Sequence, residues 1–421
     1  MSHRMLPGFT ALLFLLAAAP AAAQSLTAAA PASQGISPER LERTHALLER
    51  MVKEGKHAGV ISLVARNGRV VDWQVYGMRD LAAKLPMEKD TIVRAYSMSK
   101  VISTVAVMIL HEEGRLKLTD PVGKYLPALE KMKVYVKGSA KKPTVVDAKR
   151  QMTVKDLLTH TSGLIYGFGK EPIDEIYRDA KALESSSMDD FVQRVARLPL
   201  AFQPGERFGY GLSIDVLGAI VEKVSGMPFE RFVQERVTTP LGMVDTAYDV
   251  PENKRARMAK VYTTNKAGAL EEVPESQLAG VYAEPGRGFA AGGAGMFTTI
   301  ADYARFGQML LNGGELDGVR ILGRKTVELM QVNHLNHLSR MTTEFSESDG
   351  FGLGGSVRID LAKSNQLGSV GQYGWSGAAT TTFTIDPKEK LLVLVMAQHF
   401  PFNQHDLFWQ FSTLVYASLV D

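Results

Sequence analysis

Residues 94–110 read RAYSMSKVISTVAVMIL, and they place one lysine at the start of a run that is otherwise apolar or small. Ser97 and Lys100 are three positions apart, so both side chains lie on one face if a helix begins near Ser97. A serine becomes a nucleophile when a base accepts its proton, and a lysine can act as that base when burial disfavours its charged form. The stretch therefore predicts a buried helix whose first turn carries a reactive Ser97–Lys100 pair.

The same spacing also has a purely structural interpretation. Ser97 would cap the helix, and the Lys100 side chain would extend over apolar surface to reach water. The pattern S-x-x-K is short enough to occur by chance in 421 residues. Ser99, next to Lys100, would face another side of the helix and is the weaker candidate. The pair predicts chemistry only if other stretches supply partners for it.

A tyrosine at position 210 is the first candidate partner. It lies in GERFGYGLSIDVLG (205–218), after a Pro-Gly turn and just before a predicted helix. Its phenol could pass protons between the serine, the lysine and a leaving group. Taken alone, Tyr210 is more simply interpreted as a half-buried structural residue.

The stretch YGWSGAATTTFTIDP (373–387) is the second candidate, and it sets Trp375, Ser376 and Gly377 at the start of a predicted strand. Small residues at 377–379 would let a substrate approach the backbone closely. An N–H at the strand edge could then complete an oxyanion hole with the N–H of Ser97. Taken alone, a tight turn into the strand is the simpler explanation.

Composition places the chain among globular proteins, with 45% hydrophobic residues, 22% charged residues and a net charge of +3. No basic tract stands out, so we expect no nucleic-acid partner. The chain has no cysteine, which excludes disulfides and thiolate chemistry. P-loop, dinucleotide, H-E-x-x-H and G-x-S-x-G patterns are also missing, so we expect no cofactor and no metal. We expect a surface or core role, not metal binding, for His334 and His337.

The first 23 residues have the pattern of a secretory signal peptide. A basic start is followed by the apolar run FTALLFLLAAA and by three alanines before Gln24, which predicts cleavage after Ala23. Apolar stretches further on, such as LLVLVMA at 391–397, have the length of strands. We therefore expect a soluble periplasmic or secreted protein that has no stable membrane anchor.

The remaining residues, 24–421, have the pattern of one domain in which both ends build a sheet. Strand pairs joined at Asn67-Gly68 and at Pro387-Lys388-Glu389 each lie beside a predicted helix, which favours one antiparallel sheet. We expect the sheet part at about 35–100 and 345–421. The middle, about 101–344, shows helical spacing, with a turn-rich loop expected at 132–152. The predicted fold class is α+β, with an antiparallel sheet flanked by helices and an inserted helical domain.

Six motifs in this order resemble the serine β-lactamase-like superfamily, and more closely the family VIII carboxylesterases, over about residues 35–419. The motifs are SMSK (97–100), LLTHTSGL (157–164), FGYGLSIDVLG (208–218), PLGM (240–243), GGAGMFTTIADYARF (292–306) and GWSG (374–377). The resemblance implies a β-lactamase/transpeptidase-like fold. It also implies that Ser97 is the nucleophile, that Lys100 is its partner, that Tyr210 is the general base and acid, and that the N–H of Ala378 joins the oxyanion hole.

Two departures from the family pattern bear on the substrate. Trp375 stands where β-lactamases and penicillin-binding proteins usually have a lysine that reads a carboxylate, and an indole cannot form an ion pair. Leu212 stands where class C β-lactamases have an amide. We therefore expect an exported serine carboxylesterase that acts on small neutral esters, with short acyl chains as the family expectation.

Two alternatives remain open at this point. A β-lactamase, a D-amino-acid peptidase or an acyltransferase would use the same site with another substrate. A catalytically silent binding protein could keep the fold, although a pure binder needs none of Ser97, Lys100 and Tyr210.

Overall fold

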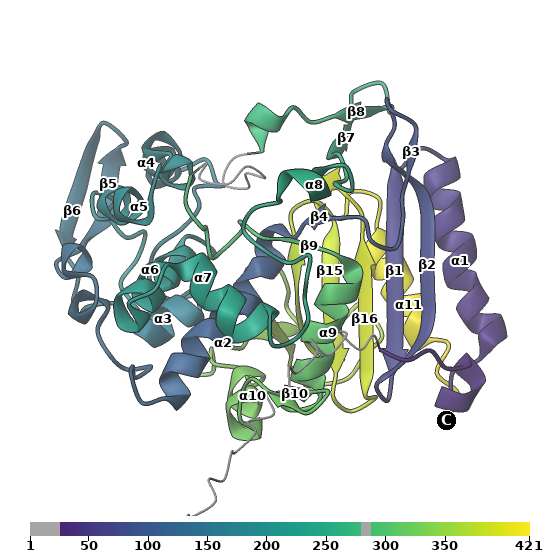
Figure 1. The fold of residues 1–421 in the computed structure, drawn as a ribbon. Helices are drawn as coiled ribbons and strands as arrows, with labels where there is room; N and C mark the ends of the chain where they lie inside the picture. The colour runs from purple at the N-terminus through teal and green to yellow at the C-terminus, as the bar shows by residue number, and fades with distance from the viewer. Residues whose placement is uncertain (1–25, 279–287) are drawn as a thin grey trace, which may run out of the picture.

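An eight-stranded sheet made from both ends of the chain forms the frame of the computed structural model, which describes residues 26–278 and 288–421 (Figure 1). Its order is β12-β13-β14-β15-β16-β1-β2-β3, and its neighbouring strands run antiparallel. The strands are β1 (Gly59–Arg66), β2 (Arg69–Asp80), β3 (Leu85–Pro86), β12 (Asp349–Phe351), β13 (Ser356–Arg358), β14 (Tyr373–Gly377), β15 (Thr381–Asp386) and β16 (Leu391–Met396). This arrangement confirms the predicted α+β class.

The two ends of the chain meet at the centre of the sheet, where β1 pairs with β16 from Ile61↔Met396 to Arg66↔Leu391. The turn between β1 and β2 contains Asn67 and Gly68, with φ of 53° and 72°. Asn and Gly tolerate this left-handed conformation, so the dipeptide closes the hairpin as predicted. Residues far apart in sequence therefore become neighbours through backbone hydrogen bonds.

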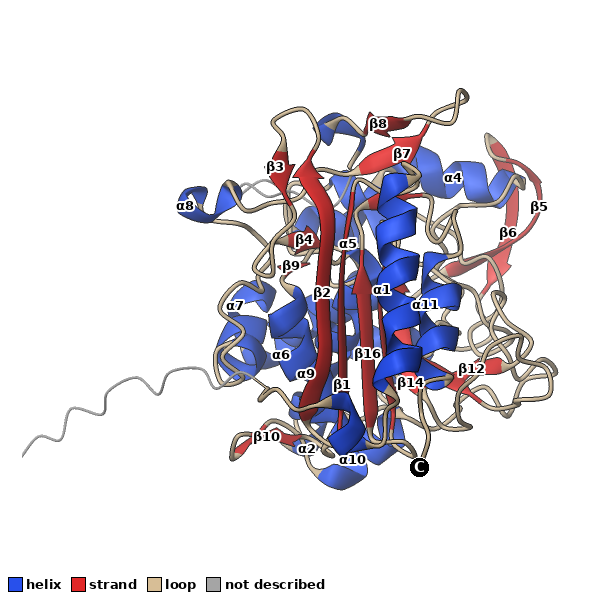
Figure 2. Ribbon diagram, turned by 90° about the vertical axis from the view of Figure 1, so that its right-hand side faces the viewer, coloured by secondary structure: helices blue, strands red, loops and turns tan. Residues whose placement is uncertain are grey.

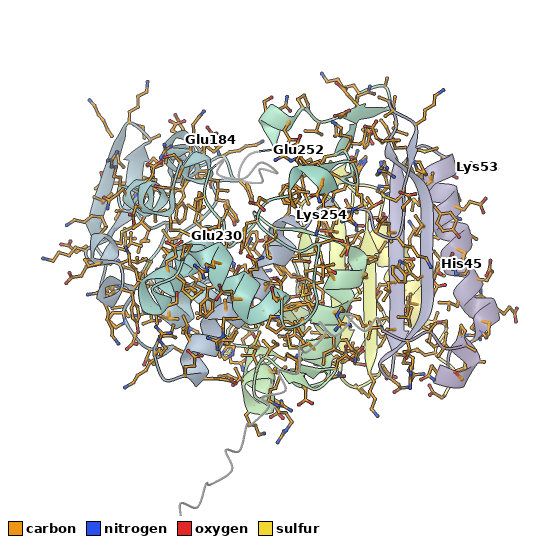
Figure 3. The ribbon with its side chains drawn as sticks, in the orientation of Figure 1. His45, Lys53, Glu184, Glu230, Glu252 and Lys254 are labelled. Atoms are coloured by element: carbon orange, nitrogen blue, oxygen red, sulfur yellow. The ribbon has the colours of Figure 1, made fainter. Side chains whose placement is uncertain are left out.

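Helices α1 (Pro38–Lys53) and α11 (Leu407–Tyr416) cover one face of the sheet (Figure 2). The Ser37 side chain caps α1 by accepting a hydrogen bond from the Arg40 N–H, as its position predicts. His45, labelled in Figure 3, lies on α1 with its Nε2 2.7 Å from Oδ1 of Asp72 on β2. Apolar residues of both helices and of the central strands form one buried cluster on this face.

The other face of the sheet packs against a mostly helical region, in which α2 (Ser99–Glu112) is buried from Ser99 to Leu110. Gly114, Gly226 and Gly313 follow helices with φ near 70°, the left-handed conformation in which glycine commonly ends a helix. None of the helices in the described ranges is both long and apolar enough to cross a membrane. The further helices are α3 (Val154–Leu158), α4 (Pro172–Ala180), α5 (Met188–Val195), α6 (Ser213–Ser225), α7 (Phe229–Val233), α8 (Glu252–Arg255), α9 (Ile300–Leu311) and α10 (Arg324–Met330).

The structure corrects the expected loop at 132–152. Strands β5 (Lys133–Ser139) and β6 (Lys142–Asp147) form a hairpin there, and all six residues of β6 are exposed. The polar tract KGSAKKP hides the strand pattern, while Val134, paired with Val146, anchors the hairpin in the core. A strand this exposed gives little hydrophobic periodicity from which to predict it.

The structure also corrects the position of 375–377. These residues do not begin the strand TTTFTID but end a separate strand, β14, which pairs with β15 across a turn at 378–380. The small strands elsewhere are β4 (Val93–Arg94), β7 (Tyr262–Thr264), β8 (Leu270–Glu272), β9 (Phe297–Thr298), β10 (Glu315–Leu316), β11 (Val319–Arg320) and β17 (His399–Phe400).

Candidate active site

Ser97 lies at a sharp junction between strand β4 and helix α2. A single 3-10 turn, Tyr96–Met98, connects the two elements. Just before it, the Ala95 N–H donates a hydrogen bond to the Met296 carbonyl oxygen at 2.9 Å. Tyr96 has a φ of 46°, a left-handed conformation that a bulky residue seldom adopts. Backbone strain of this kind gathers at functional sites, where the surrounding structure enforces it. Here it accompanies the turn that leaves Ser97 half-buried at the wall of a cavity.

The Lys100 side chain is fully buried one turn further along, and its Nζ has three acceptors. It donates to Ser97 Oγ at 3.0 Å, to Tyr166 OH at 3.1 Å and to the Gly293 carbonyl at 2.7 Å. An ammonium has three donors, so each is used. The structural interpretation, in which Lys100 extends to water, is therefore wrong.

A buried carboxylate, Asp215 on α6, lies behind Lys100. It accepts hydrogen bonds from Tyr166 OH at 3.3 Å and from the Gly293 N–H at 2.7 Å. Lys100 donates hydrogen bonds to the same two residues, so the Tyr166 hydroxyl and the Gly293 peptide each connect the carboxylate to the ammonium. Burial raises the pKa of Asp215, and the Lys100 charge partly offsets this rise. Burial, followed by the Asp215 charge, raises the pKa of Tyr166 well above its usual value and keeps the phenol neutral.

The motifs contain Asp215, Gly293 and His160, but sequence reasoning assigned these residues no role. Tyr166 lies two positions beyond LLTHTSGL (157–164), and Asp215 lies in the motif that contains Tyr210. Gly293 is sterically required, because a Cβ there would lie 2.6 Å from Asp215 Oδ2 and 2.8 Å from Tyr166 OH. The usable signal was their position inside or beside motifs that already carried a predicted catalytic residue.

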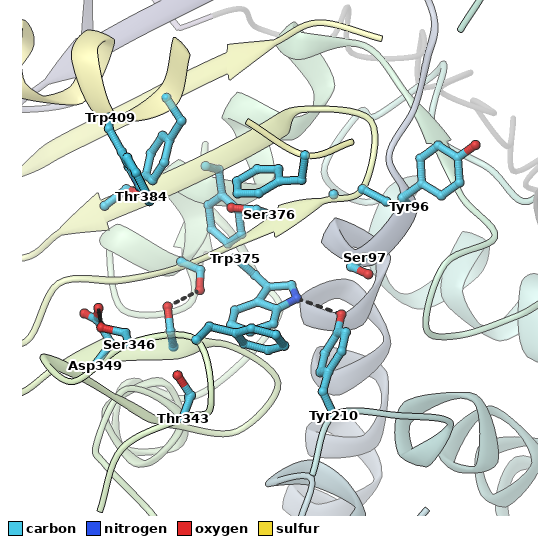
Figure 4. Close-up of a pocket in the computed structure, with 18 of the residues that line it drawn as sticks. Tyr96, Ser97, Tyr210, Thr343, Ser346, Asp349, Trp375, Ser376, Thr384 and Trp409 are labelled. Atoms are coloured by element: carbon cyan, nitrogen blue, oxygen red, sulfur yellow. Dashed lines mark hydrogen bonds between the residues drawn. The ribbon is translucent and has the colours of Figure 1, made fainter. Parts of the chain in front are cut away.

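Tyr210 lies in the loop before α6, with its ring beneath Lys100. Nζ of Lys100 is 4.6 Å from the ring centroid, a cation–π distance. The Tyr210 hydroxyl accepts a hydrogen bond from Trp375 Nε1 at 3.1 Å, drawn as a dashed line in Figure 4. Ser97, Lys100 and Tyr210 therefore meet at one site, with the phenol held by Trp375 instead of by Ser97.

The loop that carries Tyr210 is fixed by two polar groups. The Tyr210 N–H donates to Glu344 Oε1 at 3.2 Å, and the Gly211 N–H donates to His160 Nδ1 at 3.3 Å. Burial, together with the Lys100 charge, lowers the pKa of His160 well below its usual value, so the ring stays neutral and can accept this bond. The ring of His160 also packs 4.8 Å from that of Tyr210.

The end of β14 comes against the residues just before Ser97. A Cβ on Gly377 would lie 2.3 Å from the Ala95 carbonyl oxygen, so glycine is required for this close approach. The next residue, Ala378, is exposed and lines the same cavity as Ser97. Its N–H has no hydrogen-bond acceptor within residues 26–278 and 288–421. The geometry leaves this donor available to a ligand.

The cavity has a volume of about 960 Å³, and Trp375, Ser376, Gly377 and Ala378 all line it. Leu212 does not, because it is 3% exposed and packs in the core. Leu212, which replaces an amide and was expected to favour apolar substrates, therefore adds no surface to the cavity, whereas Trp375 lines it.

Histidine and carboxylate groups suited to holding a metal ion are not found in the described part of the chain. His334, considered from the sequence, has its Nε2 2.8 Å from the Leu329 carbonyl oxygen.

A family model for "Beta-lactamase" matches residues 44–414. The chain belongs to the β-lactamase family. The resemblance inferred from the six motifs is thereby confirmed. With these comparisons, the chain is a serine hydrolase of the β-lactamase fold that has esterases and acyltransferases among its relatives.

Relatives of the chain include an esterase and an acyltransferase. Esterase EstB of Burkholderia gladioli is 32% identical over 62% of this chain and 68% of its own. Monacolin J acid methylbutanoyltransferase of Aspergillus terreus is 28% identical over 79% of this chain and 83% of its own. The solved structure of EstCE1, a hydrolase with promiscuous acyltransferase activity, has a TM-score of 0.77 and 27% identity, covering 90% of this chain and 99% of its own.

Proposed function

We propose that this member of the β-lactamase family is a carboxylesterase that works through an acyl-enzyme on Ser97. The observation that carries the proposal is the fully buried Lys100, whose Nζ lies 3.0 Å from Ser97 Oγ and 4.6 Å from the Tyr210 ring. A buried ammonium is costly unless it is paired and hydrogen-bonded, and this one faces a hydroxyl and a phenol in a cavity. A structural role for Ser97 would not require it.

The first half of the reaction acylates the enzyme. Because Lys100 donates a hydrogen bond to Ser97 Oγ, the serine proton is free to point away from Lys100, toward Tyr210. Tyr210, acting as a phenolate that the nearby positive charge stabilises, accepts that proton while Oγ forms a bond to the ester carbonyl carbon. The N–H groups of Ser97 and Ala378 stabilise the oxyanion. The bond to the alkoxide then breaks, and the alkoxide takes the proton from Tyr210.

Hydrolysis repeats these steps with water as the nucleophile. Tyr210 accepts a proton from water as its oxygen attacks the acyl carbon, and it returns the proton to Ser97 Oγ when the acid leaves. Esters are favoured over carboxylate-bearing lactams because Trp375 offers an indole and no cation at the position that faces Tyr210. No cofactor enters any step, and the substrate is a small-molecule ester.

Hydrolysis of p-nitrophenyl butyrate and nitrocefin by residues 24–421 tests this proposal. We expect fast ester turnover, little nitrocefin cleavage and loss of both in Ser97→Ala. Ser99→Ala is the matched control, because Ser99 Oγ accepts from the Met296 N–H at 3.1 Å and does not line the cavity. Ester turnover that survives in Ser97→Ala would overturn the nucleophile, and nitrocefin turnover above ester turnover would overturn the substrate.

Trp375→Phe tests the role of the indole. The variant keeps an aromatic ring but removes the 3.1 Å hydrogen bond that Trp375 Nε1 donates to Tyr210. The phenolate form of Tyr210 then lacks this donor. Hydrogen bonds to charged groups are worth about 1.5–3 kcal/mol, so kcat/KM for the butyrate ester should fall about 10- to 100-fold. An unchanged kcat/KM would remove Trp375 from the mechanism.

Acyl transfer to an alcohol is the second candidate function. The same acyl-enzyme would be attacked by an alcohol in place of water, and the relative EstCE1 is described as a hydrolase with acyltransferase activity. Adding an alcohol to the butyrate assay and measuring the new ester against free butyrate gives the ratio of transfer to hydrolysis.

A further inference from the structure

The cavity extends well beyond Ser97, along an open edge of the sheet. Strand β13 pairs with β14 only at Ser356↔Gly374 and Val357↔Tyr373, so the edge at 375–377 is left free and lines the cavity. In Figure 4, Ser97 and Tyr210 lie on one side of the Trp375 indole, while Ser346 and Asp349 lie on the other. The cavity therefore has an arm on the far side of Trp375 from the nucleophile.

The volume of the cavity exceeds what a short alkyl ester fills. About 960 Å³ lies near the top of the range of roughly 300–1,000 Å³ for sites that take drug-sized ligands. Aromatic side chains form the middle of the arm: Phe345 is 61% exposed, and its ring lies 6.2 Å from Trp375 and 5.5 Å from Tyr210. A bound group of matching size would need an apolar body at this point.

The far end of the arm is polar but electrically balanced. Asp349 Oδ1 accepts from Arg358 Nε at 2.6 Å, so the buried guanidinium and the carboxylate neutralise each other. Asp349 Oδ2 accepts from Ser346 Oγ at 2.6 Å and from Ser348 Oγ at 3.0 Å. The serine hydroxyl protons are thus committed to Asp349, and Ser346 Oγ also accepts from the Ser348 N–H at 3.1 Å, so the remaining oxygen lone pairs are the free hydrogen-bonding capacity. Such an end accepts hydroxyl or N–H donors, and Lys363, which also lines the cavity, lies 3.9 Å from the Asp360 carboxylate.

The position of Tyr210 decides which half of the ester enters the arm. In the proposed reaction Tyr210 gives its proton to the departing alkoxide, so the alcohol lies on its side of the carbonyl. Tyr210 accepts a hydrogen bond from Trp375, and the arm continues past Trp375. The arm therefore receives the alcohol half of the substrate and not the acyl half.

We propose that the natural substrate is an ester of a bulky, hydroxylated alcohol. Its apolar body packs against Trp375 and Phe345, and its distal hydroxyl groups donate to Ser346 and Ser348 beside Asp349. This inference rests on the proposed esterase function and adds the class of alcohol. Small alkyl esters are then turned over without the benefit of the distal arm.

Three butyrate esters that share a phenol leaving group test the inference with residues 24–421. Phenyl butyrate has no distal body, estrone 3-butyrate adds a bulky apolar body with a distal ketone, and estriol 3-butyrate replaces that ketone with two hydroxyl groups. We expect kcat/KM to rise in this order. Each bound hydroxyl should contribute about fivefold, corresponding to one net hydrogen bond.

Ser346→Ala removes one acceptor at the far end and should lower the estriol-to-estrone ratio of kcat/KM about fivefold, chiefly through KM. Ser139→Ala is the matched control, because Ser139 lies on the exposed hairpin outside the cavity and should leave the ratio as it is. An equal ratio in Ser346→Ala and wild type would overturn the assignment of the hydroxyl groups.

Failure of this inference is distinct from failure of the esterase proposal. Turnover of phenyl butyrate that depends on Ser97, with slower turnover of both steroid esters, would overturn the bulky alcohol and leave the esterase standing. If Ser97-dependent turnover is missing for all three esters, the esterase proposal fails and this inference falls with it.

Discussion

At the scale of single residues, the positive charge of Lys100 is balanced by Asp215, which does not contact Lys100 directly. Asp215 reaches Lys100 through Tyr166 OH and through the Gly293 peptide, and both Lys100 and Asp215 are fully buried. A carboxylate in this place stabilises positive charge around Ser97 and holds the two bridging groups in position. We therefore assign Asp215 a positioning role in the proposed mechanism.

Asp215→Asn should lower kcat/KM for p-nitrophenyl butyrate about 10- to 100-fold, corresponding to about 1.5–3 kcal/mol for hydrogen bonds to a charged group. The acid limb of the pH profile of kcat/KM should move to lower pH, because removing a negative charge eases deprotonation of the groups around Ser97. Kinetics between pH 4 and 9 measure both effects.

Asp302→Asn is the matched control for this experiment. Asp302 is also a buried carboxylate, with a pKa raised by burial to about 6, but it bonds Thr246 and the Asp245 N–H away from the cavity. Its variant should leave the pH profile in place. A profile that moves equally in both variants would show that Asp215 acts only through general stability.

At the scale of elements, a cluster of three histidines packs behind the turn that follows β14. His57, His399 and His405 have ring centroids 5.0–5.6 Å apart. The His399 N–H donates to the Ala379 carbonyl at 3.0 Å, and Thr380 Oγ1 donates to the His399 carbonyl at 2.9 Å. The backbone of His399 therefore joins this cluster to the turn that presents the Ala378 N–H.

His57 should make the fold sensitive to acid. Burial, followed by the charges of His399 and His405, lowers its pKa to about 3, and Lys56 beside it acts in the same direction. The pKa of His57 in the folded protein lies below its unfolded value of 6.5. The contribution of the neutral His57 ring to the free energy of unfolding is therefore complete above pH 6.5 and is lost as pH falls toward 3. Between pH 6.5 and 5, the loss should be about 2 kcal/mol.

Urea unfolding of His57→Gln at the two pH values measures this effect, since glutamine does not titrate and the variant should lose that part of the pH dependence. His337→Gln, at an exposed histidine, is the control. A wild-type pH dependence retained in His57→Gln would contradict the assignment.

At the scale of the whole molecule, stability depends on closing the sheet with the last helix. Phe411 on α11 is fully buried in the cluster that joins α1, the central strands and α11. Phe411→Ala should lower the free energy of unfolding by about 3–5 kcal/mol. Gln410→Ala, at the exposed neighbouring position, should change it by less than about 0.5 kcal/mol. Equal Tm values for the two variants would show that α11 is dispensable to the core.

Export is a further proposal at this scale, and it concerns residues 1–23, which lie outside the described residues. We propose that the chain is exported to the periplasm or beyond the cell and is cut after Ala23. N-terminal sequencing of the protein recovered from a cell that expresses all 421 residues should begin at Gln24. Recovery of the uncut chain from the cytoplasm would contradict this.

Local sequence determined the elements and the candidate nucleophile. The 2- and 3.6-residue periods, the Asn67-Gly68 turn and the Ser97–Lys100 spacing act over a few residues, so they can be interpreted without the fold. The exposed β5–β6 hairpin escaped prediction because a strand that buries little leaves no apolar pattern.

Only the tertiary structure decided what surrounds the pair. Gly293 accepts a hydrogen bond from Lys100 across 193 positions of chain and donates one to Asp215 across 78, and close packing of α2 against α6 brings Asp215 near Lys100. Trp375 meets Tyr210 from 165 positions away, and Leu212, beside that tyrosine in sequence, turns into the core. Contacts of this range depend on how helices and strands pack, and no local pattern in the sequence encodes them.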